Sequence, residues 1–216
     1  NDENVVELCA RSFPHTEEVI YSDESKEKMK KLINEFQPVK GVVAHEGTIL
    51  RLFYVDGEWH FSTHRKINGF KSRWTGETFG SVFDRLLPDF QTKDLNKDYC
   101  YVLLLEDSNT NLVCNEISGA VYHTITYDTK TKQMVKPLNV IGNVAQIISV
   151  NNIDSILEVV SNINPRKECG VLLSNSKGEY LKILNQNYYL SRCFRGNEHS
   201  ISIKYLQHRI DDMTPY

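Results

Sequence analysis

The sequence predicts an α+β fold, with mostly antiparallel strands and helices interposed between them. Two hairpin signals support the strand part of this prediction: Asp56-Gly57 and residues 175–178 each separate two strand-like runs. Apolar residues at helical spacing in residues 25–36 and 153–163 support the helical part. Hairpins separated by helices in this way are typical of α+β proteins.

The composition sets limits on the function. The chain has 216 residues, a formal net charge of −3 at pH 7 and 40% hydrophobic residues, as expected of a soluble globular protein with a core. Because the chain is not basic overall, nucleic-acid binding would require a local cationic patch. Five cysteines without a C-x-x-C pair favour free thiols in a cytoplasmic or other intracellular compartment. No run is apolar enough to span a membrane, so no membrane partner is expected.

Each expected element of the first part of the chain follows from residue spacing or from a breaker. Residues 1–21 are expected to be irregular, and residues 25–36 to form an amphipathic helix that Pro38 ends. A strand over residues 39–44 leads into the first hairpin. Residues 78–87 repeat apolar side chains at helical spacing and are expected to form a second helix.

The Asp56-Gly57 turn fixes the register of the first hairpin. A type I′ turn needs positive φ at both central residues, which this dipeptide favours. The expected cross-strand pairs are Val55 with Glu58, Tyr54 with Trp59, Leu52 with Phe61, and Leu50 with Thr63. Alternation then gives an apolar face: Leu50, Leu52, Tyr54, Trp59 and Phe61. The opposite face is mixed: Ile49, Arg51, Phe53, His60, Ser62 and His64.

The second part of the chain reads as strands around one further helix. Residues 99–105 form a continuous apolar run, which predicts a buried central strand. Residues 107–111 are polar and are expected to form a turn. The other expected elements are strands at 112–114, 121–127, 140–150, 170–173 and 179–184, and a helix at 153–163. Residues 200–210 alternate first and are expected to finish as a helix.

A basic segment follows the first hairpin. Residues 64–74 interleave cations with Phe70 and Trp74, which would suit phosphate pairing and base stacking with a single-stranded nucleic acid. The alternative is a solvated loop whose aromatic residues anchor it to the core. His60 and His64 share a strand face but would lie about 13 Å apart at strand rise, so no metal site is expected there.

The order of these elements resembles a known family. A strand, then Glu46-Gly47-Thr48, then an Asp-Gly hairpin ending in Ser-Thr-His-Arg-Lys, resembles the start of the covalent nucleotidyltransferases. The phage-type ATP-dependent RNA ligases are most similar, with mRNA capping guanylyltransferases and DNA ligases as more distant relatives. Three later segments of this chain also resemble motifs of the family: residues 101–113, Cys169-Gly170-Val171-Leu172, and residues 180–189. The resemblance implies an ATP-grasp-like RNA/DNA ligase fold.

Residue by residue, most of the family's reactive positions are changed. The family's nucleophilic lysine aligns with Ala44, and its strand glutamate aligns with Leu104. The next glutamate aligns with Cys169, which follows Glu168, and one of the two paired lysines aligns with Leu184. Glu46, Gly47 and Lys182 remain. A covalent bond to the nucleotide requires a primary amine, and carboxylates and cations must position the metal and phosphates. The resemblance therefore implies a pseudoenzyme.

Three hypotheses follow. The first is a domain without catalysis, cofactor or metal that serves as a structural, RNA-binding or protein-binding module of a larger assembly. Its candidate nucleotide- or RNA-binding residues are Glu46, Arg51, Arg65, Lys66, Lys71, Arg73 and Lys182. The second is an active RNA ligase or guanylyltransferase that uses ATP or GTP with Mg²⁺. It would use Lys66 of Lys66-Ile67-Asn68-Gly69 as nucleophile, or carry an engineered change at Ala44. The third is that the alignment is wrong and the domain is of another kind.

We expect residues 1–38 to form an N-terminal segment and helix packed on the core, and residues 39–216 to form one nucleotidyltransferase-like domain. The sequence begins with Asn1 rather than Met, as a piece of a longer protein could. The resemblance is to virus and phage versions of the fold, so a virus-encoded protein is expected.

Overall fold

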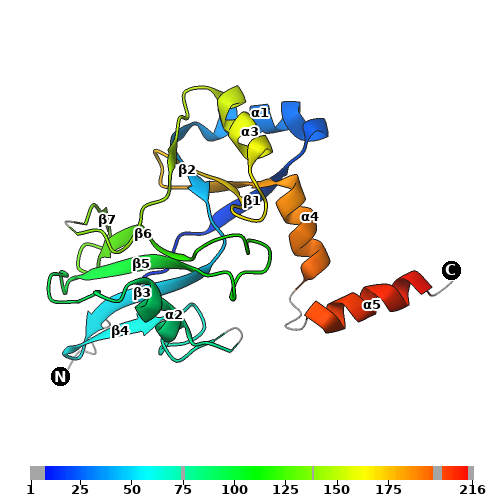
Figure 1. Ribbon diagram of the computed structural model, residues 1–216. Helices are drawn as coiled ribbons and strands as arrows, with labels where there is room; N and C mark the ends of the chain where they lie inside the picture. The colour runs from blue at the N-terminus through cyan, green and yellow to red at the C-terminus, as the bar shows by residue number, and fades with distance from the viewer. Residues whose placement is uncertain (1–7, 74–75, 138, 197–200, 214–216) are drawn as a thin grey trace, which may run out of the picture. The chain divides into compact units, whose positions relative to one another are not determined.

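The computed structural model describes residues 8–73, 76–137, 139–196 and 201–213 (Figure 1). Contacts group the chain into two compact units. The first contains residues 1–16, 47–110 and 118–147, and the second contains residues 17–46, 111–117 and 148–216. The expected boundary at residue 38 lies inside the second unit. The mixture of helices and antiparallel strands confirms the predicted α+β class.

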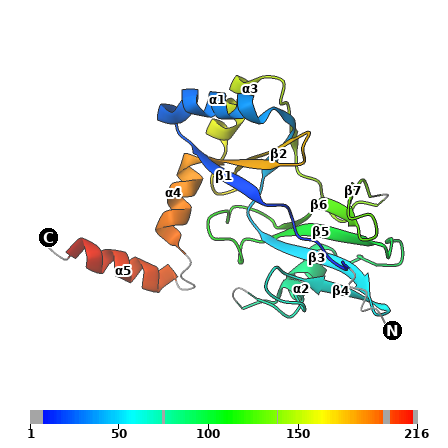
Figure 2. The ribbon, with the colours of Figure 1, turned by 180° about the vertical axis from the view of Figure 1, so that it is seen from behind.

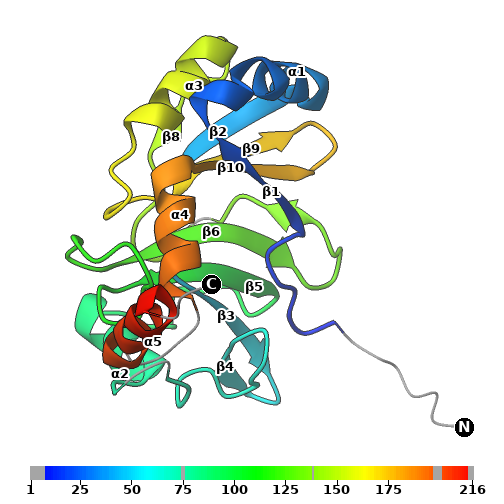
Figure 3. The ribbon, with the colours of Figure 1, turned by 90° about the vertical axis from the view of Figure 1, so that its right-hand side faces the viewer.

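The first unit is built on a sheet with the strand order β4-β3-β5-β6-β7 (Figure 3). Its elements are β3 (Thr48–Val55), β4 (Glu58–Ser62), α2 (Phe79–Leu86), β5 (Tyr99–Glu106), β6 (Ala120–Asp128) and β7 (Met134–Val135). β5 is central and largely buried, as its apolar run predicts. Leu50 and Leu103 of the sheet pack against Phe83 of α2, and all three are fully buried.

The first hairpin confirms the predicted turn and register. Asp56 and Gly57 have φ values of +51° and +86°, so both central residues take the conformation that a type I′ turn requires. The strands pair Val55 with Glu58, Tyr54 with Trp59, and Leu52 with Phe61. The pairing ends at Arg51 and Ser62, one residue before the predicted pair of Leu50 and Thr63.

The second unit is built on a sheet with the strand order β1-β10-β9-β2-β8. Its strands are β1 (Thr16–Tyr21), β2 (Pro38–Ala44), β8 (Ile147–Ile148), β9 (Gly170–Asn175) and β10 (Tyr180–Asn185). Its helices are the short η1 (Asp23–Ser25), α1 (Lys26–Phe36), α3 (Ile153–Asn162), α4 (Gln186–Arg195) and α5 (Ile201–Met213). Figure 2 shows α1 and α3 close together beside this sheet. Ile33 of α1 and Ile156 of α3 pack against Val171 of β9, and all three side chains are fully buried.

Several predicted elements are confirmed, and others are wrong for identifiable reasons. The helices at α1, α2 and α3 and the β9–β10 hairpin lie where residue spacing places them. The expected strand over residues 140–150 shrinks to β8, because the chain turns at Gly142, whose φ is +69°. The expected strand at 112–114 is absent, because a side chain rather than a neighbouring strand binds its amides.

The strand β1 and the helix α4 of the second unit have no counterpart in the predictions. β1 lies in a segment expected to be irregular, where the adjacent Glu17 and Glu18 interrupt any alternation of apolar and polar residues. α4 begins directly after β10, where the Asn185 side chain accepts hydrogen bonds from the amides of Asn187 and Tyr188. Residues 201–213 are helical throughout and contain no initial strand. Within the part of the chain that the structure describes, no helix is both long and apolar enough to cross a bilayer.

Candidate functional site

Three positions onto which the resemblance places reactive residues of the family lie together in the second unit. Ala44, at the end of β2, pairs with Gly170 of β9, and Gly170 pairs with Leu184 of β10. Cys169 directly precedes Gly170. The sheet register therefore gathers Ala44, Cys169 and Leu184 from segments up to 140 residues apart, and relative exposures of 6%, 0% and 1% bury all three.

These three residues belong to a small apolar cluster rather than to a charged site. The buried members are Ala44, Val113, Cys114, Cys169, Leu184 and Tyr188. Gly170 allows the strands to approach closely, because a Cβ there would overlap the carbonyl oxygen of Ile183. The cluster therefore offers a methyl group, a thiol and an isobutyl group at the positions onto which the resemblance places an amine, a carboxylate and a second amine.

The thiol of Cys169 cannot replace a carboxylate. Its Sγ donates to the carbonyl oxygen of Ala44 at 3.0 Å, and its backbone amide donates to the same oxygen at 2.9 Å. Burial raises the pKa of the Cys169 thiol to about 11. Burial likewise raises the pKa of the Tyr188 hydroxyl far above its ordinary range. Both groups therefore stay neutral at physiological pH and do not supply a negative charge for a metal.

Glu46 holds a loop of its own unit. Its Oε1 accepts from the amide of Leu112 at 2.9 Å, and its Oε2 accepts from the amides of Val113 and Cys114 at 3.0 and 2.8 Å. The side-chain amide of Asn111 also donates to the backbone oxygen of Glu46 at 3.1 Å. Three amide donors on one carboxylate make a strong, charge-assisted arrangement. The Glu46 carboxylate therefore fixes residues 111–114, where sequence analysis expected a strand.

Lys182 lies at the edge of the apolar cluster. Its side chain is 20% exposed, and its positive charge acts to lower the pKa of the Cys169 thiol, against the larger effect of burial. Its Nζ lies 3.5 Å from Oε1 of Glu18 in β1, and Nη1 of Arg192 in α4 lies 3.1 Å from the other oxygen of Glu18. Sequence analysis missed Glu18 and Arg192, because β1 and α4 were not predicted.

The other candidate cations belong to the first unit. Arg51 of β3 donates to the backbone oxygen of Thr63, and its Nε is buried without a partner among the described residues. Arg51 therefore secures the end of the hairpin. Lys66 lies in an exposed turn closed by hydrogen bonds of 2.9 and 3.0 Å between Thr63 and Lys66. Arg65, Lys71 and Arg73 are exposed in the same segment.

Phe70 anchors this basic segment to the core. Its ring lies 4.2 Å from that of Phe61 and 5.7 Å from that of Phe83 between centroids. Phe70 therefore packs inside the first unit, which is the arrangement that the alternative, a loop anchored to the core by its aromatic residues, predicts. Trp74, the second aromatic residue of the interpretation, lies outside the described residues.

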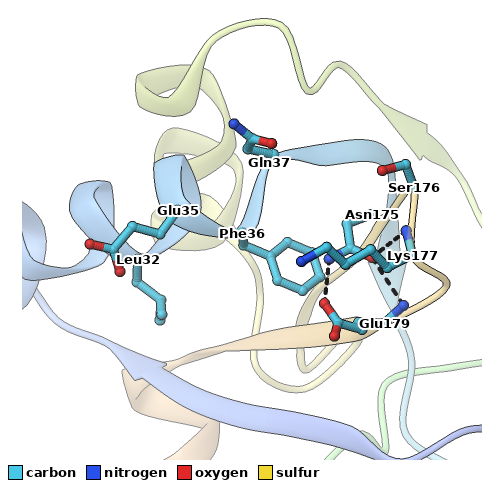
Figure 4. Close-up of a pocket in the computed structure, with 8 residues that line it drawn as sticks. All are labelled: Leu32, Glu35, Phe36, Gln37, Asn175, Ser176, Lys177 and Glu179. Carbon is cyan, nitrogen blue, oxygen red and sulfur yellow. Dashed lines mark hydrogen bonds between the residues drawn. The ribbon is translucent and has the colours of Figure 1, made fainter.

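A separate shallow pocket of about 250 Å³ lies in the second unit (Figure 4). It is lined by Leu32, Glu35, Phe36, Gln37, Asn175, Ser176, Lys177 and Glu179. The side-chain amide of Asn175 donates to Glu179 at 2.7 Å, which serves the β9–β10 turn. No candidate residue lines this pocket.

The structure thus brings Glu46 and Lys182 together with Ala44 in one unit and places Arg51 and the basic segment in the other. Among the described residues, no group of three His, Cys, Asp or Glu side chains is placed to hold a metal ion. The residues around Ala44 do not fit the lysine-bound nucleotide that the resemblance implies, because the buried side chains that pack with Ala44 carry no amine.

Similar proteins with curated names are viral. The chain is 29% identical over 212 residues to the "Immediate-early protein ICP-46 homolog" of Invertebrate iridescent virus 3, covering 92% of this chain and 46% of that protein. It is 27% identical over 238 residues to the homolog of Invertebrate iridescent virus 6, covering 93% and 50%. The chain thus spans about half the length of the curated relatives it matches. No family model matches the chain.

Solved structures identify the fold. An archaeal ATP-dependent RNA ligase matches with a TM-score of 0.58 and 13% identity, over 85% of this chain and 51% of that one. An RNA ligase of Naegleria gruberi with PPi matches with a TM-score of 0.52 and 16% identity, over 89% and 63%. The chain therefore has the nucleotidyltransferase fold of ATP-dependent ligases, as the resemblance predicted.

Proposed function

We propose that this ligase-fold chain is a virus-encoded pseudoenzyme, which forms no covalent bond to a nucleotide and binds RNA through exposed cations. Its similarity to viral proteins over 92% of its length supports the viral origin. The burial of Ala44, Cys169 and Leu184 in one apolar cluster is the observation that supports the loss of catalysis.

The chemistry of the ligase reaction explains why this cluster matters. A covalent nucleotide intermediate needs an amine nucleophile, and a methyl group cannot replace it. Phosphoryl transfer also needs groups that position the phosphates and neutralise their charge. Because three changed positions are packed against one another, restoring the amine alone would bury an ammonium group in an apolar cluster, which costs several kcal/mol. A single substitution at Ala44 therefore does not account for the site.

Transfer of radiolabel to the protein tests the loss of catalysis. The chain is incubated with α-labelled ATP or GTP and with Mg²⁺ and Mn²⁺, then separated on a denaturing gel beside an active RNA ligase of the same fold. We expect label on the active ligase and none on this chain. Label that disappears in Lys66→Ala would overturn the proposal and identify Lys66 as a nucleophile.

The four exposed cations between residues 65 and 73 support RNA binding. Among the residues that the structure describes, none of the four forms an ion pair, so their charges are available to phosphates. They are Arg65, Lys66, Lys71 and Arg73. Binding through such contacts weakens as the salt concentration rises, because each phosphate contact releases counterions.

A charge-reversal pair of variants tests this second part. The test variant replaces Arg65, Lys66 and Arg73 with Glu. The matched control replaces three exposed lysines of α1 with Glu: Lys26, Lys28 and Lys31. We expect a single-stranded oligoribonucleotide to bind wild type and control in a salt-sensitive manner and to bind the test variant at least tenfold more weakly. Equal affinity of the two variants would refute RNA binding by this segment.

A further inference from the structure

One carboxylate of the second unit is held between two cations from different elements. Glu18 of β1 contacts Lys182 of β10 through Oε1 at 3.5 Å and Arg192 of α4 through Oε2 at 3.1 Å. Two positive charges thus surround one negative charge. The side chains are 38%, 20% and 39% exposed, in the order Glu18, Lys182 and Arg192, so a ligand in solution can reach the group.

This pair of cations suits a phosphate group as well as a carboxylate. A guanidinium binds carboxylate and phosphate oxygens through the same planar set of donors, and a lysine ammonium binds phosphate as a point charge. A carboxylate leaves one of the two positive charges uncompensated. A phosphate with two negative charges would compensate both, so it has an electrostatic advantage over Glu18 at this position.

We propose that Lys182 and Arg192 form a binding site for a phosphate group, and that Glu18 occupies this site in the free protein. This inference rests on the proposed function and deepens it by naming the ligand chemistry of the second unit. Among the described strands, β1 lies at the edge of its sheet, beside β10. Glu18 therefore acts as an internal competitor carried on the border of the sheet.

The contacts of Glu18 are weak enough to be displaced. Partly exposed ion pairs contribute roughly 0.5 kcal/mol each, so the two contacts of Glu18 together contribute about 1 kcal/mol, which corresponds to about a fivefold change in an equilibrium constant. Removing the negative charge of Glu18 should therefore tighten phosphate binding about fivefold. Removing either cation should abolish this gain.

Calorimetric titration measures the affinity for phosphate ligands, and EDTA removes the metal ions that a nucleotidyl transfer to the protein would require. The probes are pyrophosphate, ATP and a 5′-phosphorylated oligoribonucleotide, and the test variant is Glu18→Gln. Glu17→Gln is the matched control, because Glu17 neighbours Glu18 in β1 but points to the opposite face of the strand. We expect Glu18→Gln to bind about fivefold more tightly than wild type and Glu17→Gln.

The outcomes test two things separately: which kind of molecule supplies the phosphate group, and whether Lys182 and Arg192 bind it. The probe with the largest gain identifies the source as free phosphate, nucleotide or nucleic acid. The gain should vanish in Glu18→Gln/Lys182→Met and in Glu18→Gln/Arg192→Met, with folding checked by circular dichroism. Unchanged affinity of folded Glu18→Gln for every probe, or a gain that survives both double variants, would overturn the site. Failure of the proposed function would instead appear as covalent label in the presence of metal.

Discussion

Replacing Glu46 with Gln should destabilise the second unit through the loop at residues 111–114. In the wild type, one carboxylate accepts three backbone amides at 2.8 to 3.0 Å. Gln keeps one carbonyl oxygen and turns an NH₂ group toward at least one of these donors. Cys114 is fully buried and Val113 is 9% exposed, so water does not readily replace the lost acceptor.

The magnitude follows from these contacts. A hydrogen bond to a charged group contributes roughly 1.5–3 kcal/mol, and an unsatisfied buried amide costs about 1–3 kcal/mol. Since Oε2 serves two amides and Oε1 serves one, Glu46→Gln loses at least one bond and leaves at least one donor unpaired. We expect the free energy of unfolding to fall by about 2–4 kcal/mol.

Urea unfolding followed by circular dichroism, together with hydrogen exchange, measures this loss. Tryptophan fluorescence is unsuitable, because Trp59 lies in the first unit and the second unit has no tryptophan in its sequence. Glu158→Gln is the control, because Glu158 is exposed on α3 of the same unit. The amides of residues 112–114 should exchange faster in Glu46→Gln only. Stability within about 0.5 kcal/mol of the control, with unchanged amide protection, would refute the role of Glu46.

Three further results are expected. Gly170→Ala should lower the free energy of unfolding by about 2 kcal/mol or more, because the added methyl overlaps the Ile183 carbonyl oxygen. Gly76→Ala is the control in thermal melts, because the methyl there meets open space. Equal melting temperatures of the two variants would contradict the close packing at Gly170. Burial lowers the pKa of His123 to about 4, so the unfolded chain binds more protons and stability should fall by up to about 3 kcal/mol from pH 6.5 to 4. An equally steep fall in His123→Asn would contradict this assignment. Ala44→Lys should lower the free energy of unfolding by several kcal/mol, because its ammonium group enters the apolar cluster. Equal midpoints of urea unfolding for variant and wild type would contradict this burial.

Local chemistry explains which elements the sequence predicts well. The first hairpin depends on Asp56-Gly57 and on strict alternation, both of which are visible within 20 residues. α1 and α3 depend on apolar residues at helical spacing and on breakers nearby. Such elements are set by their own residues, so they can be predicted without the rest of the fold.

Long-range contacts explain the errors. Residues 112–114 have the composition of a strand, but the carboxylate that binds their amides comes from Glu46, 66 to 68 residues earlier. β1 exists because it pairs with β10 at the far end of the chain. The gathering of Ala44 with Cys169 follows from the pairing of β2 with β9. The resemblance to the ligases indicated this gathering, whereas periodicity and composition could not. Neither the resemblance nor the periodicity and composition of the sequence indicated the pairing of Glu18 with Arg192.

The intact mass of the protein after incubation with ATP or GTP, Mg²⁺ and Mn²⁺ tests the loss of covalent chemistry most directly. We predict that the wild type keeps its unmodified mass, and that Ala44→Lys also does, because in the proposed function Cys169 and Leu184 stand where an active ligase has charged groups. A wild-type mass increased by one nucleotidyl group would contradict the account. The same increase in Ala44→Lys alone would show that one lost amine, rather than the whole cluster, accounts for the missing activity.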